Sequence, residues 1–265
     1  MDIRAKFLRE FAKTRLPSSP GDAAPVTAAE IEALPAPAQR YLRFMGVVGR
    51  PRDWSFRAGF EGWFRFRPHR RFMACDAWQY TNRLGLGRAF HALMRFGYVV
   101  PIVGRDSYAR GQGRVQIRLL DAYTYADLKG EAYDASGLVA YLNDVALLAP
   151  SMLLVPEVAW SAVDNSSFTL AITDQGHTVS ARILVDERGA LVEFTTTDRY
   201  YTDPDDPKNA QRVRWTTPVS GWERIDGRQL FTRAEARWHL PAGLFTYADF
   251  RPIPGALAFN VPPGE

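Results

Sequence analysis

Three side chains in this sequence have the chemistry of an acid–base site: Asp76, Asp106 and Tyr108. Asp76 has the same strand parity as Trp78 and Tyr80, so the three side chains are expected on one face. A carboxylate held among aromatic rings loses hydration, which raises its pKa and suits it to general acid–base catalysis. The alternative is a bulge that turns Asp76 outward, or an arginine partner across the strand. Asp76 is therefore a candidate catalytic residue only if the protein is an enzyme.

Asp106 and Tyr108 lie two residues apart, and a strand places both on the same face. An aspartate beside a tyrosine can orient a polar group of a ligand or transfer a proton. The same pair can instead form a structural hydrogen bond at the end of a hairpin, which is the interpretation we favour. His91 has the opposite parity to Phe90, and we expect it to face solvent.

Motifs for other chemistry do not occur in the sequence. It has no Gly-x-Ser-x-Gly nucleophile elbow, no Gly-x4-Gly-Lys-Ser/Thr phosphate loop and no paired-cysteine zinc pattern. Cys75 is the single cysteine, which excludes an intramolecular disulfide, and the four histidines are scattered without an i, i+4 pair. We therefore predict no metal and no cofactor.

The strongest pattern in the chain is the alternation at residues 54–66, WSFRAGFEGWFRF. Its even positions carry aromatic residues or alanine, apart from Gly62, and charged residues gather at odd positions. Phe60, Phe64 and Phe66 are therefore predicted to face the interior and Trp63 to face away. Residues 72–81 read as the next strand, with a second aromatic face. The predicted ligand-binding residues from these two strands are Phe60, Phe64, Phe66, Trp78 and Tyr80.

Tight turns and one long helix organise the remaining chain. Consecutive strands joined by short turns indicate antiparallel pairing, and Asp226-Gly227 is the clearest hairpin signal. Residues 114–125 read as one strand, entered through a turn at residues 111–113. Apolar residues at helical spacing predict a helix over 134–149, and DPDDPK at 203–208 predicts a rigid acidic loop. The predicted fold is α+β: a large curled antiparallel sheet (half-barrel) of about ten strands around one main helix, with short N-terminal helices.

Residues 2–14 form a basic amphipathic helical pattern, followed by a linker rich in proline, serine, glycine and alanine that ends at residue 26. Such a helix can make peripheral contact with a membrane or dock on the rest of the protein, and we favour docking. The linker predicts that deleting the helix changes stability little. The predicted division is residues 1–26, an N-terminal amphipathic helix and linker, and residues 27–265, a single half-barrel domain.

Composition and charge are those of an ordinary globular protein, with 46% hydrophobic and 23% charged residues. The net charge of +4 divides into +12 up to Leu120 and −8 beyond it. Because the arginines alternate with apolar residues on predicted strands, a solvated sheet face explains the basic half, and we predict no nucleic-acid partner. The sequence has no apolar signal-peptide core at its N-terminus and no run of membrane-spanning length, so the expected location is the cytoplasm.

The stretch LPAPAQRYLRFMGVVGRP at residues 34–51 resembles a family of uncharacterised bacterial proteins, a domain of unknown function. Shorter matching stretches follow in order up to about Phe250: RDSY at 105–108, GQGR at 111–114, LLD at 119–121 and LPAG at 240–243. This resemblance implies no activity and no site residue. More distantly, long antiparallel strands around a helix resemble the half-barrel of bacterial lipoprotein carriers, which implies an apolar concavity that holds acyl chains.

The leading expectation from the sequence is the binding of a hydrophobic small molecule or lipid in an apolar half-barrel cavity. One alternative is a cofactor-free enzyme, an isomerase, cyclase or hydrolase, that uses Asp76 or the pair of Asp106 and Tyr108 as general acid and base. Another alternative is a structural or membrane-peripheral protein whose apolar face is simply core and encloses no cavity of ligand size.

Overall fold

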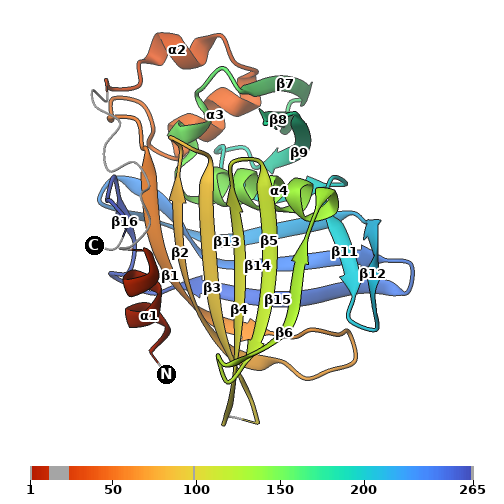
Figure 1. The fold of residues 1–265 in the computed structure, drawn as a ribbon. Coiled ribbons are helices and arrows are strands. Elements are labelled where there is room, and N and C mark those ends of the chain that lie inside the picture. Colours follow the sequence, from red (N-terminus) through yellow and green to blue (C-terminus); the bar gives the residue numbers. More distant parts are fainter. Residues whose placement is uncertain (1, 12–23, 98, 264–265) are drawn as a thin grey trace.

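A computed structural model describes residues 2–11, 24–97 and 99–263 (Figure 1). Its helices are α1 (Ile3–Phe11), α2 (Ala28–Glu32), α3 (Ala36–Phe44) and α4 (Glu131–Leu148), and a 3-10 turn covers Pro150–Leu153. Its strands are β1 (Ser55–Phe64), β2 (Met73–Asn82), β3 (Gly87–Phe96), β4 (Val100–Ala109), β5 (Gln112–Leu119), β6 (Tyr123–Lys129), β7 (Val158–Asp164), β8 (Ser167–Asp174), β9 (His177–Val185), β10 (Leu191–Thr196), β11 (Tyr200–Asp203), β12 (Asp206–Arg212), β13 (Trp215–Ile225), β14 (Arg228–Leu240), β15 (Gly243–Pro252) and β16 (Ala258–Phe259).

Fourteen strands of the described residues form one antiparallel sheet in the order β6-β5-β4-β3-β2-β1-β15-β14-β13-β10-β9-β8-β7, with β16 added beside β1. The pairing of β1 with β15 joins the two halves of the chain. In Figure 1 strands β2 to β6 run steeply in front of β13 to β15, which cross behind them. The fold is therefore α+β with an open, curled sheet, as predicted, and the sheet is wider than the predicted ten or so strands.

Turn residues with left-handed backbone set the strand boundaries. Asp226 and Gly227 have φ of 49° and 75° and close the β13–β14 hairpin where the sequence predicts it. The β4–β5 turn lies at Arg110-Gly111, one residue earlier than expected, with φ of 54° and 78°. Leu120 and Asp121 also have left-handed backbone, with φ of 53° and 56°. They form a turn that divides the predicted single strand 114–125 into β5 and β6.

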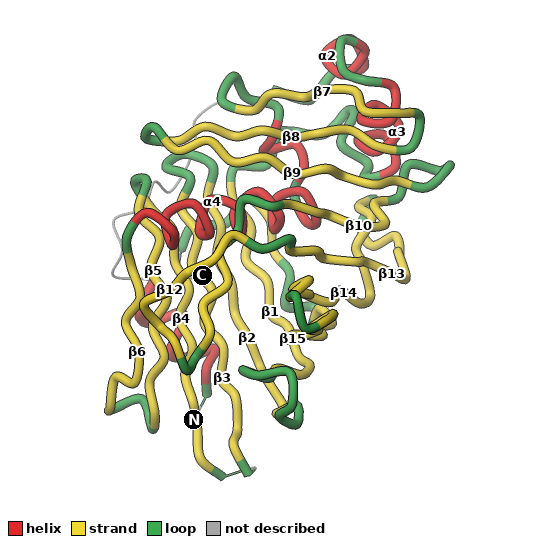
Figure 2. The backbone as a smooth tube through the Cα atoms, turned by 90° about the vertical axis from the view of Figure 1, so that its right-hand side faces the viewer, coloured by secondary structure: helices red, strands yellow, loops and turns green. Residues whose placement is uncertain are grey.

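Helix α4 lies inside the curl of the sheet and contacts strands of both halves, as Figure 2 shows from the side. It begins three residues before the predicted start and ends one residue before the predicted end. It packs closely on β4 at Gly137, where a Cβ atom would lie 2.9 Å from a ring carbon of Tyr108. Leu138, Leu142 and Val145 are fully buried, so the helix is the centre of the core.

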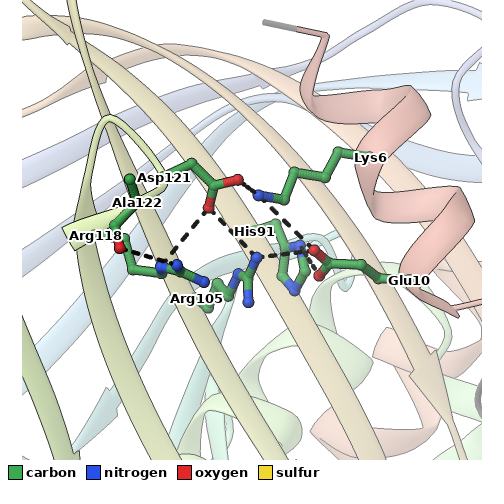
Figure 3. A network of polar contacts seen from close by, with 7 residues as sticks. All are labelled: Lys6, Glu10, His91, Arg105, Arg118, Asp121 and Ala122. Atoms are coloured by element: carbon green, nitrogen blue, oxygen red, sulfur yellow. Dashed lines mark hydrogen bonds and ion pairs between the residues drawn. The ribbon is translucent and has the colours of Figure 1, made fainter. Parts of the chain in front are cut away.

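Helix α1 docks on the outer face of the sheet. Ile3 and Phe7 are buried in an outer cluster with Trp78, Tyr80 and Leu93, to which Ala89, Val103 and Ala256 also belong. Figure 3 shows the polar contacts beside it: Lys6 pairs with Asp121, and Glu10 pairs with Arg105 at 2.8 Å. The apolar face of α1 is therefore buried against the sheet, and residues 12–14 of the predicted helix lie outside the described residues. None of the described helices is long and apolar enough to span a membrane.

Candidate ligand cavity

The concave face of the sheet encloses a cavity of about 1410 Å³. Inward side chains of β1 to β5 and β13 to β15 line it, and α4 contributes Ala140 and Leu147. Pockets for small ligands measure roughly 300–1,000 Å³. The cavity is therefore large enough for a ligand with one or more long hydrocarbon chains.

One end of the cavity wall is a group of four phenylalanines from four strands. The ring centroid of Phe60 on β1 lies 6.4 Å from that of Phe90 on β3 and 6.4 Å from that of Phe231 on β14. Phe250 on β15 lies 6.3 Å from Phe60 and 6.1 Å from Phe90. These rings present apolar faces and edges to the cavity without any polar group of their own.

A second aromatic group lies where β1 meets β13 to β15. The ring of Tyr247 lies 5.6 Å from Phe64, 6.2 Å from Trp238 and 6.1 Å from Phe245. Trp215 joins the group through its indole nitrogen, which donates a hydrogen bond of 3.2 Å to the Tyr247 hydroxyl. Both aromatic groups line the same cavity.

A buried ionic group ties α4 to the sheet at the cavity wall. Arg88 on β3 lies between two carboxylates, with Nη1 2.9 Å from Asp106 Oδ2 and Nε 2.5 Å from Asp144 Oδ2. The side-chain amide of Gln79 donates to Asp144 at 2.7 Å. Burial lowers the pKa of Arg88, but the two carboxylates outweigh burial and raise the pKa above its usual value. Asp106 therefore holds a structural arginine inside the protein.

The predicted pair of Asp106 and Tyr108 does not form. Both side chains have the inward parity of β4, but the Tyr108 hydroxyl donates to Asp174 Oδ2 at 2.7 Å, at the end of β8. Tyr108 is fully buried beneath Gly137 of α4. Burial raises the pKa of the Tyr108 phenol, and the hydrogen bond to Asp174 raises it further. A structural hydrogen bond at the end of a strand is thus present, with a different partner from the expected one.

Two segments far apart in sequence come together at the cavity wall. The β1–β2 connection, residues 65–72, meets the β11–β12 hairpin through an ion pair of 2.5 Å between Arg67 and Asp205. The hydroxyls of Thr202 and Tyr133 are 2.7 Å apart and connect the hairpin to α4. Figure 1 shows the hairpin beside one end of α4. DPDDPK is therefore part of a two-stranded hairpin, where the sequence predicted a loop.

Asp76, Trp78 and Tyr80 lie on the outer face of the sheet, so the predicted inward face of β2 is wrong. In the β1–β2 register Trp78 lies opposite Gly59 and Ala77 opposite Phe60, and opposite residues of a pair share a face. Trp78 and Tyr80 belong to the outer cluster beneath α1. Asp76 is 40% exposed and pairs with Arg95 at 2.7 Å. An arginine partner is one of the alternatives that the sequence leaves open for Asp76, and this is what the structure shows. The Asp76 carboxylate does not line the cavity.

Phe60, Phe64 and Phe66 line the cavity. Strand β1 pairs with both neighbours without a register shift at Gly62, so alternation continues to Phe64. Trp63 therefore has the opposite parity, as the sequence predicts; it is 48% exposed and also borders the cavity. Contact of the three phenylalanines with a ligand stays a prediction.

Sequence reasoning missed most of the cavity wall. Phe90, Phe231, Trp238, Tyr247 and Phe250 come from β3, β14 and β15. Phe90 belongs to an alternation with Ala92 and Met94 that the sequence does show. On β14 and β15 the cavity-lining aromatic residues change parity, from Phe231 to Trp238 and from Tyr247 to Phe250. Alternation in the sequence therefore does not identify their inner face, and the pairing of β1 with β15 does.

The described residues contain no group of three histidine, cysteine, aspartate or glutamate side chains that could hold a metal ion. Cys75 is buried behind β1, and burial raises the pKa of its thiol above the usual range, which disfavours the thiolate. The cavity wall thus consists of apolar and aromatic side chains with several charged groups.

Comparison with known proteins places most of the chain in one family. Residues 24–250 match a family described as "Family of unknown function (DUF6544)". Among curated proteins, none matches the sequence.

Two similar solved structures are a putative outer membrane lipoprotein-sorting protein domain from Vibrio parahaemolyticus and a LolA superfamily protein from Nitrosomonas europaea. The first is 8% identical with a TM-score of 0.41 and covers 78% of this chain and 85% of its own. The second is 10% identical with a TM-score of 0.39 and covers 85% and 91%.

Proposed function

We propose that this chain, which belongs to that family of unknown function, binds a hydrophobic small molecule or lipid in its half-barrel cavity. The observation that carries the proposal is the cavity of about 1410 Å³ with its two aromatic groups. A protein whose apolar face is simply core would have filled this space, because protein interiors are close-packed. The ligand-free structural alternative predicts no cavity of ligand size and is disfavoured.

The enzyme alternative depended on three residues that the structure places in other contacts. Asp76 lies on the outer surface with Arg95, Asp106 holds Arg88, and Tyr108 donates to Asp174. Asp106 and Asp144, which do line the cavity, are both bound to Arg88 as structural ion-pair partners. Binding is the function that the geometry supports best, and a cytoplasmic location accompanies it as a proposal.

Two measurements test the proposal. Native mass spectrometry of the purified protein is expected to show a copurifying apolar molecule that organic extraction removes. The extracted protein is then expected to bind the neutral fluorophore N-phenyl-1-naphthylamine, with a rise in its fluorescence. Failure of the extracted, folded protein to bind this fluorophore would contradict the proposal.

A matched pair of variants locates the binding. Ala248→Trp places an indole in the cavity wall, where Ala248 is 3% exposed and lies opposite Phe64. It is expected to weaken fluorophore binding about tenfold, the order of effect that a steric change in an apolar pocket produces. Ile225→Trp at the exposed end of β13 adds an indole outside the cavity and is expected to bind as the parent does.

A further inference from the structure

Two arginines at one end of the cavity make no ion pair with any carboxylate of the described residues. Arg65 follows β1 and Arg199 precedes β11; both line the cavity and both are partly buried. Of the other arginines around the cavity, Arg67 pairs with Asp205 and Arg95 pairs with Asp76, and Arg70 and Arg71 are exposed. Arg65 and Arg199 therefore bring partly buried positive charge, without a carboxylate partner among the described residues, to the cavity wall.

Arg65 is held in one orientation by the chain around it. Its Nε donates to the carbonyl oxygen of Thr246 at 2.7 Å, and its Nη1 donates to that of Pro68 at 2.8 Å. Its guanidinium carbon lies 4.5 Å from the ring centroid of Phe72 and 5.3 Å from that of Phe245. Arginine has five N–H donors in a planar fork, so the donors of Nη2 stay available to a ligand.

Arg199 is held by aromatic faces. Its guanidinium carbon lies 4.1 Å from the ring centroid of Trp215 and 5.7 Å from that of Trp238. An indole face attracts a cation through its quadrupole and uses none of the cation's N–H donors. Within the part of the chain that the structure describes, this guanidinium donates no hydrogen bond. Its N–H donors are thus held in place by the indole rings and stay available to a ligand.

The two guanidinium groups stand over adjacent rings. Trp238 on β14 and Phe245 on β15 are directly opposite each other in the sheet. Opposite residues of an antiparallel pair have Cβ atoms roughly 4.5–5.5 Å apart. Arg65 lies over Phe245 and Arg199 lies over Trp238. Two arginine forks in one place suit a group with two or more anionic oxygens, which such forks bind with paired hydrogen bonds.

A buried ionic group on the cavity wall has the opposite net sign. Arg88 is shared by Asp106 and Asp144, which leaves one excess negative charge when both carboxylates are ionised. In a poorly hydrated cavity such charges act more strongly than in water. An anion is therefore attracted to Arg65 and Arg199 and repelled from the Arg88 group, so an amphiphile takes one direction in the cavity.

We propose that Arg65 and Arg199 bind the anionic head group of an amphiphile, a carboxylate or a phosphate, whose hydrocarbon chain fills the cavity. This inference rests on the proposed function and names the chemical class of the ligand. The head group accepts hydrogen bonds from both guanidinium groups, and the chain lies against the group of four phenylalanines.

The inference is tested with four probes that share one alkyl chain: hexadecanoate, hexadecyl phosphate, hexadecan-1-ol and hexadecyltrimethylammonium. Each competes with N-phenyl-1-naphthylamine for the extracted full-length protein. The two anions are expected to bind at least about tenfold more tightly than the alcohol, the effect of one charge-assisted hydrogen bond, and the ammonium most weakly. A preference for the phosphate over the carboxylate indicates a lipid phosphate as the source, and equal affinity indicates a free fatty acid.

Variants connect the preference to the two arginines. Arg65→Gln and Arg199→Gln are expected to bring hexadecanoate binding down toward that of hexadecan-1-ol and to leave the alcohol unchanged. Arg224→Gln, an exposed arginine of β13 outside the cavity, is the matched control. Equal binding of anions and alcohol by the parent, or an anion preference that persists in the double variant, overturns the inference. In either case retained fluorophore binding leaves the proposed function standing, whereas its loss in the folded parent refutes that function itself.

Discussion

The two faces of the sheet around β2 and β3 carry similar apolar side chains, but one face is covered by a helix and the other lines a cavity. On the outer face Trp78 and Leu93 are covered by α1, with Phe7 only 1% exposed. On the inner face Phe60 and Phe90 line the cavity, and α4 packs mainly on β4, β5 and β9. The comparison teaches that the covering element, rather than the residue types of the strand, decides whether an aromatic face becomes core or binding surface.

Charges distinguish the two faces as well. On the outer face the charges surround α1 and are mostly paired, as with Lys6 and Asp121. On the inner face one group is paired and buried at Arg88, and another is left unpaired at Arg65 and Arg199. The inner face thus carries two arginines without an ion pair among the described residues, in addition to one paired and buried group.

The largest expected effect comes from breaking the buried ion group of the inner face. Arg88→Met leaves Asp106 and Asp144 without their partner in a site where the Arg88 side chain is 6% exposed. Removing one member of a buried ion pair costs about 4 kcal/mol, because the remaining charge stays desolvated. Urea denaturation at pH 7 is expected to show this loss in the free energy of unfolding.

The matched control is Arg95→Met on the outer face. Arg95 and Asp76 are 35% and 40% exposed, and an exposed pair of this kind contributes less than about 1 kcal/mol. Equal losses in the two variants would show that the Arg88 group is hydrated in solution, and would contradict the description of the cavity wall.

Phe7→Ala breaks the cover of the outer face. Truncation of a buried phenylalanine costs about 3 kcal/mol, and α1 then holds the outer cluster less firmly. The free energy of unfolding, measured in urea, is expected to fall by this amount. A loss below about 1 kcal/mol would show that α1 is already detached in solution, which is the behaviour that the linker alone predicts.

Local patterns in the sequence predicted the elements well and the covering of the faces poorly. The β1 alternation, the α4 periodicity and the Asp226-Gly227 turn are all local signals, and each appears in the structure near its predicted place. His91 shows the limit. Its parity opposite Phe90 is confirmed, but it is buried rather than solvent-facing, because α1 from the other end of the sequence lies over it.

The candidate site shows the same limit. An aromatic stripe such as that of β2 is equally consistent with either face, and only the register against β1 places Trp78 outside and Ala77 inside. The pairing of β1 with β15 brings Phe250 to Phe60 across most of the chain. Single-sequence periodicity contains no information on such pairings, so most of the cavity wall could not be predicted.

Acidification tests the outer face through His91. Burial, and then the positive charges of Arg105 and Lys6, lower the pKa of His91 to about 3, although Glu10 of α1 lies 3.7 Å from its Nδ1. The unfolded chain has a histidine pKa of about 6.5 and takes up the proton first. Stability from His91 is therefore complete above pH 6.5 and falls as the pH drops toward 3. At pH 5 the expected loss is about 2 kcal/mol.

The measurement compares the parent with His91→Gln between pH 8 and pH 5. Glutamine keeps a polar side chain in the site and removes the titration. The difference in the free energy of unfolding between the two proteins is expected to shrink or reverse as the pH falls. Parallel curves for the two proteins would mean that His91 titrates normally in the folded state, and that α1 does not cover it.

The smallest expected effect on stability comes from Phe90→Ala on the inner face, the counterpart of Phe7→Ala. Phe90 already borders open space, so its truncation enlarges an existing cavity and creates no new enclosed one. Its side chain is only partly buried, and the expected loss in the free energy of unfolding is about 1 kcal/mol. Binding of N-phenyl-1-naphthylamine is expected to weaken several-fold, because one aromatic ring of the cavity wall is missing.

Phe7→Ala is expected to have the opposite profile. It causes a large loss of stability and little change in fluorophore affinity, measured at a temperature where the variant is folded. If Phe90→Ala instead costs as much stability as Phe7→Ala and leaves fluorophore binding intact, Phe90 is core, and the two faces of the sheet do not differ as described.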